Sequence, residues 1–186
     1  MKNCLFTVLL LTVIISSCKE NDKEKADPPI SALSIIKGQL AQLDTSLYQV
    51  TKIETAGRGS DTAIIKREDI RKYAAAFLSL PEIANSKYYK RYKEERFIDQ
   101  EQGTLSITAF ANDGNAEIQK QILIISLADL ANGKVRNIYI DRQRTEGQNL
   151  IEEKLFWEID SYFSIGSIIQ KQNQPEETKL IKIEWQ

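Results

Sequence analysis

Histidine is absent from this sequence, and cysteine occurs only at Cys4 and Cys18. Catalytic Cys–His pairs and Ser–His–Asp triads need an imidazole, so both classes of enzyme are excluded. Structural zinc sites made of Cys and His ligands are excluded as well. Only carboxylates, lysine, tyrosine or a metal with oxygen ligands remain for catalysis. We therefore expect a protein that is not an enzyme and that holds no cofactor and no metal.

The sequence also lacks a strong bias of charge. It carries 25 basic and 26 acidic side chains, a formal net charge of −1, without a long block of like charge. Proteins that bind nucleic acid concentrate basic side chains against the phosphates. No nucleic-acid partner is expected.

The first 18 residues predict export and lipidation. Lys2 precedes an apolar run over residues 5–15, which is too short to span a bilayer and has the flanks of a secretory signal. The following Ile15-Ser16-Ser17-Cys18 resembles the lipobox of bacterial lipoproteins, where the cysteine becomes the lipidated first residue. The resemblance implies a signal peptide over residues 1–17, acyl chains such as palmitate on Cys18, and a lipid-anchored envelope protein, expected at the outer membrane. An ordinary secretory signal cleaved elsewhere, or a buried helix, is the alternative.

Residues 18–29 predict a charged tether. Beyond Cys18 this segment contains no large apolar side chain, so we expect it to be solvated. A flexible chain of this length spans on the order of 20 Å. The stretch Cys18-Lys19-Glu20-Asn21-Asp22 resembles the export signal of surface-exposed lipoproteins of the Bacteroidota, although a generic charged linker fits equally well. The periplasmic or surface side therefore stays open.

Two amphipathic helices are predicted before Pro81. The first has apolar residues every three or four positions: Leu33, Ile36, Leu40, Leu43, Leu47 and Val50. Asp27 before Pro28, or Ser31, would cap its start, and residues 48–53 also fit an extended segment. Residues 57–61 are expected to form a loop.

The second helix is predicted over residues 66–80. Its buried face would carry Ile70, Tyr73, Ala74 and Phe77, and Pro81 would end it.

From Thr104 onward, apolar and polar residues alternate, which is typical of half-buried strands. Turn signals at Asp113-Gly114, Asn132-Gly133 and residues 158–161 separate the alternating segments. Six strands are predicted, at residues 104–109, 118–125, 135–142, 150–157, 162–169 and 181–185. The expected fold is a single α+β domain over residues 30–186, with two N-terminal helices packed on one face of an antiparallel meander of five to six strands.

Several blocks resemble uncharacterised lipoproteins of the Bacteroidota. They are residues 77–83, 92–95, 138–141 and 154–157 with 162–165. This resemblance implies the envelope compartment and a single domain, and it implies no activity, ligand or catalytic residue.

Residues 87–96 predict the best contact surface. Tyrosines and cations alternate closely here, and the possible ligand contacts are Lys87, Tyr88, Tyr89, Lys90, Arg91, Tyr92 and Lys93. Such side chains stack on sugar rings and pair with phosphates of envelope glycans. The alternative, which we favour, is that the tyrosines pack at the edge of the core while the cations face water.

Other residues of chemical interest have plainer explanations. Glu94, Glu95, Asp99 and Glu101 are close in sequence, as a pair of catalytic carboxylates would have to be in space. Alternate residues of a strand point to opposite faces, however, so closeness in sequence does not bring these carboxylates together. Trp157 and Trp185 are expected in the core. The predicted function is a non-enzymatic, lipid-anchored protein that binds a partner protein or an envelope glycan. A carrier or sensor of an apolar ligand held between helices and sheet is the alternative, and an enzyme comes third.

Overall fold

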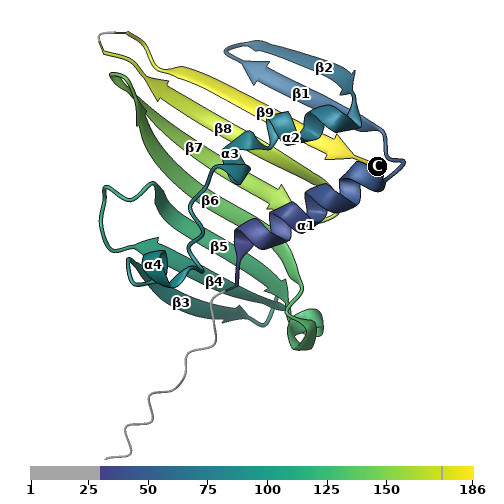
Figure 1. Cartoon of the computed structure of the whole chain (residues 1–186), viewed down its shortest axis with the longest axis vertical. Helices are drawn as coiled ribbons and strands as arrows, with labels where there is room; N and C mark the ends of the chain where they lie inside the picture. Colours follow the sequence, from purple (N-terminus) through teal and green to yellow (C-terminus); the bar gives the residue numbers. More distant parts are fainter. Residues whose placement is uncertain (1–29, 173) are drawn as a thin grey trace, which may run out of the picture.

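A nine-stranded antiparallel sheet dominates the fold, in the order β2-β1-β9-β8-β7-β6-β5-β4-β3 (Figure 1). The computed structural model describes residues 30–172 and 174–186. The strands are β1 (Val50–Ala56), β2 (Gly59–Ile65), β3 (Tyr92–Asp99), β4 (Thr104–Ala111), β5 (Ile118–Ser126), β6 (Val135–Glu146), β7 (Asn149–Glu158), β8 (Tyr162–Gln170) and β9 (Glu177–Trp185). Strands β3 to β9 form a meander, and β9 then pairs with β1. The β1–β2 hairpin at the start of the domain thereby extends the sheet beyond β9, its last strand in the chain.

The prediction of two helices on a sheet of five to six strands is wrong. The six predicted strands correspond to β4–β9, and the structure adds β1, β2 and β3. Strands β1 and β2 form a hairpin around Gly57 and Arg58, where the positive φ of Gly57 (56°) suits the tight turn. Residues 59–61, expected in a loop, begin β2.

Strand β3 was missed because its sequence is charged. It lies at the edge of the sheet, where charged side chains reach water without breaking the pairing. Alternate residues share a face of the strand, so Lys93 pairs with Glu95 and Arg96 with Glu94, each at 2.8 Å.

Helix α1 (Ala32–Thr45) confirms most of the first predicted helix, and it ends earlier than the pattern suggested. Ser31 is its cap, because its Oγ accepts a hydrogen bond from the amide of Ser34 at 2.9 Å. Leu47, expected on the buried face, is 98% exposed, and Val50 begins β1. The alternative cap at Asp27 lies outside the described residues.

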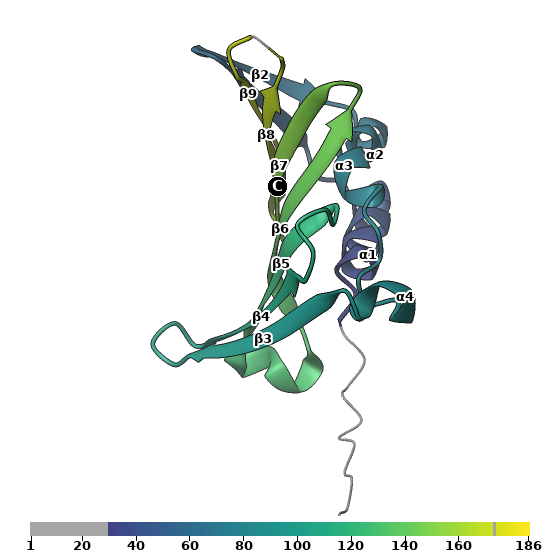
Figure 2. The same cartoon turned by 90° about the vertical axis from the view of Figure 1, so that its left-hand side faces the viewer.

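The second predicted helix is divided into three short pieces. They are η1 (Arg67–Asp69), α2 (Ile70–Tyr73) and α3 (Ala75–Leu78), and the break falls at Ala74, whose ψ of 3° is not helical. A further short helix, α4 (Ser86–Tyr89), precedes β3. The helices α1 to α4 lie on one side of the sheet (Figure 2). Within the described residues, no helix has the length and apolar content needed to cross a bilayer.

Aromatic side chains join the helices to the sheet. Phe77 of α3 meets the ring of Trp157 edge-on at 5.1 Å and the ring of Phe163 at 5.5 Å. Trp157 and Phe163 stack at 4.7 Å, and Trp185 lies 5.9 Å from Trp157. All four rings are buried, so the prediction that both tryptophans belong to the core is confirmed.

Candidate binding surface on the open face of the sheet

The side of the sheet opposite the helices is not covered by another described element (Figure 2). We call this side the open face. Alternate residues of every strand point towards it. Its apolar side chains, assigned from the strand register, are Ile53, Ile64, Phe97, Phe110, Ile122, Ile124, Tyr139, Leu150, Phe156, Tyr162, Ile168 and Leu180. Four of them are at least 38% exposed: Ile64, Phe97, Phe110 and Leu180.

The centre of the open face is apolar and aromatic. Ile122, Tyr139 and Phe156 are consecutive cross-strand neighbours on β5, β6 and β7. The ring of Phe156 also lies 5.5 Å from that of Tyr162 on β8. Neighbouring aromatic and β-branched residues form a continuous half-buried stripe across four strands.

Charged side chains surround this stripe in pairs of opposite sign. Lys120 pairs with Asp141 at 3.0 Å, and Lys182 pairs with Glu184 at 2.7 Å. Both lysines also lie over aromatic rings, Lys182 at 4.4 Å from the centre of Tyr162. Burial, together with the Asp141 carboxylate, raises the pKa of Tyr139 above its ordinary value.

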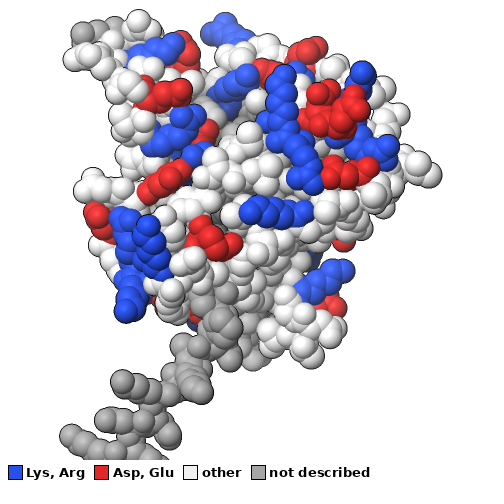
Figure 3. All heavy atoms as spheres, in the orientation of Figure 1, with Lys and Arg blue, Asp and Glu red and all other residues white. Residues whose placement is uncertain are grey.

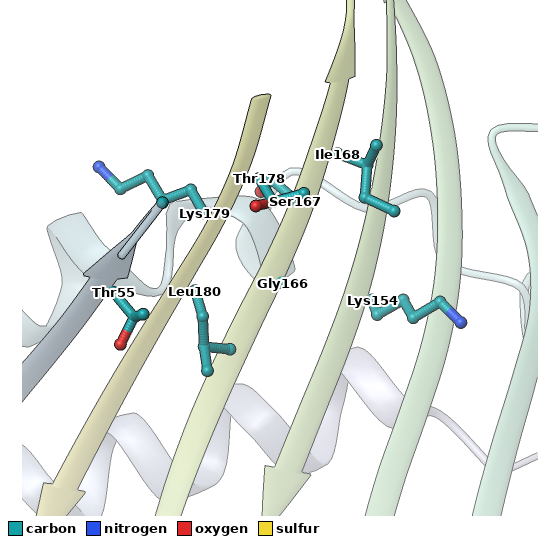
Figure 4. Close-up of a pocket in the computed structure, with 9 residues that line it drawn as sticks. Thr55, Lys154, Gly166, Ser167, Ile168, Thr178, Lys179 and Leu180 are labelled. Atoms are coloured by element: carbon teal, nitrogen blue, oxygen red, sulfur yellow. The ribbon is translucent and has the colours of Figure 1, made fainter. Parts of the chain in front are cut away.

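A hollow of about 250 Å³ opens on this face where a glycine interrupts the rows of side chains. Gly166 of β8 stands between Leu180 of β9 and Lys154 of β7 in the same cross-strand row. The remaining walls come from β1, β8 and β9 (Figure 4), as Thr55, Ser167, Ile168, Thr178 and Lys179, and from Gly57 in the β1–β2 turn. A Cβ on Gly166 would meet its nearest atom at 3.9 Å, so the hollow exists because of the missing side chain and not because of backbone crowding.

Among the described residues, the buried carboxylate of Glu153 is held by arginines. Arg142, with 9% of its side chain exposed, pairs with Glu117 and, at 3.1 Å, with Glu153, of which 7% is exposed. Arg144 lies 3.5 Å from Glu153, and Arg142 also donates to the carbonyl of Ala76 in α3. Guanidinium groups on both sides hold the carboxylate of Glu153 in place. This cluster ties α3 to the sheet and does not offer a free general acid.

The acidic side chains of β3 and of the β3–β4 turn do not point into a common site. Glu94 and Glu95 point to opposite faces, and each pairs with a cation of its own strand. The carboxylate of Asp99 accepts the amide N–H of Gln102 at 2.9 Å and closes the β3–β4 turn. Glu101 is exposed in that turn.

A cavity on the helix side of the sheet measures about 20 Å³. It lies between Ile30, the loop at Ile83 and the neighbouring parts of α4 and the sheet. This volume accommodates about one water molecule, whereas a small-molecule pocket needs roughly 300 Å³ or more. The cavity therefore gives no support to the carrier hypothesis.

The segment expected to contact ligand is divided between water and the core edge. Its cations Lys87, Lys90, Arg91 and Lys93 are exposed, whereas Tyr88, Tyr89 and Tyr92 are half-buried. Tyr89 and Tyr92 line the 20 Å³ cavity, and burial raises the pKa of Tyr92. The other predicted site residue, Cys18, lies outside the described residues.

In residues 30–172 and 174–186, no three His, Cys, Asp or Glu side chains are grouped to hold a metal ion. The buried core residues all fall between Ala32 and Trp185. We expect the chain from Lys19 to Gln186 to fold, and to show the same midpoint of thermal unfolding with and without reductant or chelator. Circular dichroism melts measure this, and a chelator-dependent loss of several degrees would reveal a metal site.

Comparison with protein-family models, with curated proteins and with solved structures finds no match to this chain.

Sequence reasoning missed the hollow at Gly166, although a signal was present. A glycine inside an alternating strand often marks a close approach or a gap in side-chain packing. Gly166 stands in such a position within β8. The pattern does not say which face of the strand remains uncovered.

Proposed function

We propose that this protein is a non-enzymatic, lipid-anchored component of the bacterial cell envelope whose open face binds a partner protein. Anchoring would use acyl chains on Cys18, as the lipobox-like Ile15–Cys18 segment suggests, with the outer membrane as the expected site. The domain over residues 30–186 would carry the binding surface.

The open face with its Gly166 hollow is the observation that carries this proposal. An apolar centre surrounded by polar and paired charged groups is the usual anatomy of a protein interface. A hollow beside that centre suits a single anchoring side chain, the kind of contact that dominates binding energy. Exposed apolar side chains on the same face also favour a binding role.

The chemistry of the hollow defines the partner further. Its base is Gly166 with Leu180 and Ile168 beside it, and Lys154 at its edge is exposed and has no ion pair within the described residues. Lys179, in contrast, pairs with Glu54 at 2.5 Å. We therefore infer a protein partner that inserts an apolar side chain next to a carboxylate, which would pair with Lys154.

A partner protein is favoured over a glycan by the lysines on the aromatic rings. Sugar rings stack on exposed aromatic faces, but Lys182 lies over Tyr162 and Lys120 over Tyr139, at 4.4 and 5.4 Å from the ring centres. Each lysine is held in place by a carboxylate neighbour. Stacking a sugar there would require breaking these contacts first.

Site-specific crosslinking in cells tests the proposed surface. A photo-crosslinking amino acid replaces Thr178 at the rim of the hollow or, as a control, exposed Lys72 on the helix side. We expect Thr178, and not Lys72, to give a discrete protein adduct. Gly166→Val should reduce that adduct at least tenfold, because the new side chain fills the hollow.

The matched control is Thr108→Val, which adds no volume on the same face and lies away from the hollow. It should leave the adduct unchanged, and thermal melts should show that both variants fold. An adduct that is digested by glycan-degrading enzymes would replace the protein partner with a glycan. Equal crosslinking from Thr178 and Lys72, or none from either, would show that the open face is not the binding surface.

A further inference from the structure

A patch of basic side chains lies on and beside α4. Lys87, Lys90 and Arg91 are exposed, and Figure 3 shows basic side chains gathered at the end of the molecule where α4 lies. The half-buried ring of Tyr88 lies among them, 5.5 Å from the amine of Lys87. We call these four residues the α4 patch.

The α4 patch keeps most of its positive charge. Arg91 lies 3.8 Å from the carboxylate of Asp113, which is a loose pair. Lys87 and Lys90 have no ion pair within the described residues. The next cation, Lys93, is paired with Glu95 on β3 and belongs to the balanced strand surface. The patch therefore differs from the rest of this segment in offering two lysines to an external anion.

The beginning of the described chain is fixed beside this patch. Ile30 lines the small cavity together with Tyr89 of α4. The hydroxyl of Ser31 donates a hydrogen bond to the carboxylate of Glu82, in the loop before α4. Residues 18–29 could extend over at most about 40 Å from this point. If Cys18 is held in a membrane, a tether that begins beside the α4 patch lets this patch reach the lipid.

We propose that the α4 patch contacts the anionic phospholipid headgroups of the membrane in which the protein is anchored, and so orients the domain on it. This inference rests on the lipid anchoring in the proposed function. The tether maintains a high local concentration of headgroups, so a few weak contacts are sufficient. Lysine and arginine supply the attraction to an anionic surface, and an amphipathic tyrosine suits the interface.

The experiment uses the lipidated protein in vesicles. Because the domain after Cys18 contains no cysteine, Ser86→Cys at the start of α4 accepts a single environment-sensitive fluorophore. Vesicles are made of phosphatidylcholine alone or with about a third phosphatidylglycerol. We expect a blue shift of the emission only with the anionic lipid, and its loss at 1 M salt, where charges act over only about 3 Å.

Charge variants separate the patch from general electrostatics. Lys87→Gln, Lys90→Gln and Arg91→Gln together should abolish the shift. Removing three exposed lysines elsewhere, by Lys37→Gln, Lys72→Gln and Lys134→Gln, changes the net charge equally and should leave the shift in place. A label at Arg58→Cys, in the β1–β2 turn, should not respond to the lipid composition.

Sedimentation of the same vesicles separates this inference from the anchoring. Protein that sediments with both types of vesicle but shows no lipid-dependent shift would overturn the α4 contact and leave the anchor intact. Protein that does not sediment would show that the anchoring itself fails. A shift in phosphatidylcholine alone would also overturn the inference, because no anionic headgroup is then required.

Discussion

Phe77→Ala should lower the free energy of unfolding by about 3–5 kcal/mol, the range for removing a buried phenylalanine ring from a packed core. The Phe77 ring is fully buried and contacts both Trp157 and Phe163. It comes from the short helix α3, which has little helical stability of its own, so this ring is a main attachment of the helical layer to the sheet. Alanine would leave a cavity that the stacked pair on β7 and β8 cannot fill.

Urea denaturation followed by tryptophan fluorescence measures this loss, because Trp157 lies next to the altered site. Phe97→Ala is the matched control, since the same ring is 67% exposed on edge strand β3. It should change stability by only about 0.5 kcal/mol. Similar losses in the two variants would mean that α3 does not hold the helices on the sheet.

Much of this core could be predicted from periodicity. Ile70, Tyr73, Ala74 and Phe77 were assigned to one buried helical face. Tyr73 is half-buried and the other three are buried, even though the helix is broken at Ala74. Residues three or four positions apart share a face of a helix, and they still do so when two short helices follow each other directly. Strands β4 to β9 were equally clear, because burial on one face of an antiparallel sheet enforces alternation.

Strand β1 could not be separated from the preceding helix by the sequence alone. Val50 follows Leu47 by three residues and continues the helical spacing, yet it is the first residue of β1. Leu47 is exposed in the connection. Val50 belongs to a strand because β1 pairs with β9, and this pairing joins residues more than 120 positions apart in the sequence.

The candidate surface was hidden for a related reason. Alternation indicates that each strand has two faces, but it does not tell which partner covers either face. In the apolar run of β5, Ile122 and Ile124 point to the uncovered side, whereas Ile125 is in the core. The side occupied by the helices is a tertiary property, and it creates the open face.

Cys18→Ala should abolish acylation and move the protein out of the membrane fraction. This prediction rests on the resemblance of residues 15–18 to a lipobox, in which the cysteine sulfur accepts the lipid. Burial of an acyl chain contributes about 0.8 kcal/mol per methylene, and two or more chains make attachment stable while one gives only marginal binding. Without the sulfur no chain is attached, and the domain offers no membrane-spanning helix among its described residues to replace it.

Incorporation of labelled palmitate and detergent-free washing of isolated envelopes measure the two consequences. Cys4→Ala provides the matched control, because it removes the other cysteine of the chain and should leave palmitate and membrane attachment unchanged. A Cys18→Ala protein that still takes up palmitate, or that resists the washes as the unaltered protein does, would show that the anchor is not at Cys18. The proposed α4 contact alone would not retain it, because an attraction carried by a few exposed cations is screened within about 8 Å at physiological salt. In the proposed arrangement, stable attachment would come from the acyl chains on Cys18 and orientation on the membrane from the α4 patch.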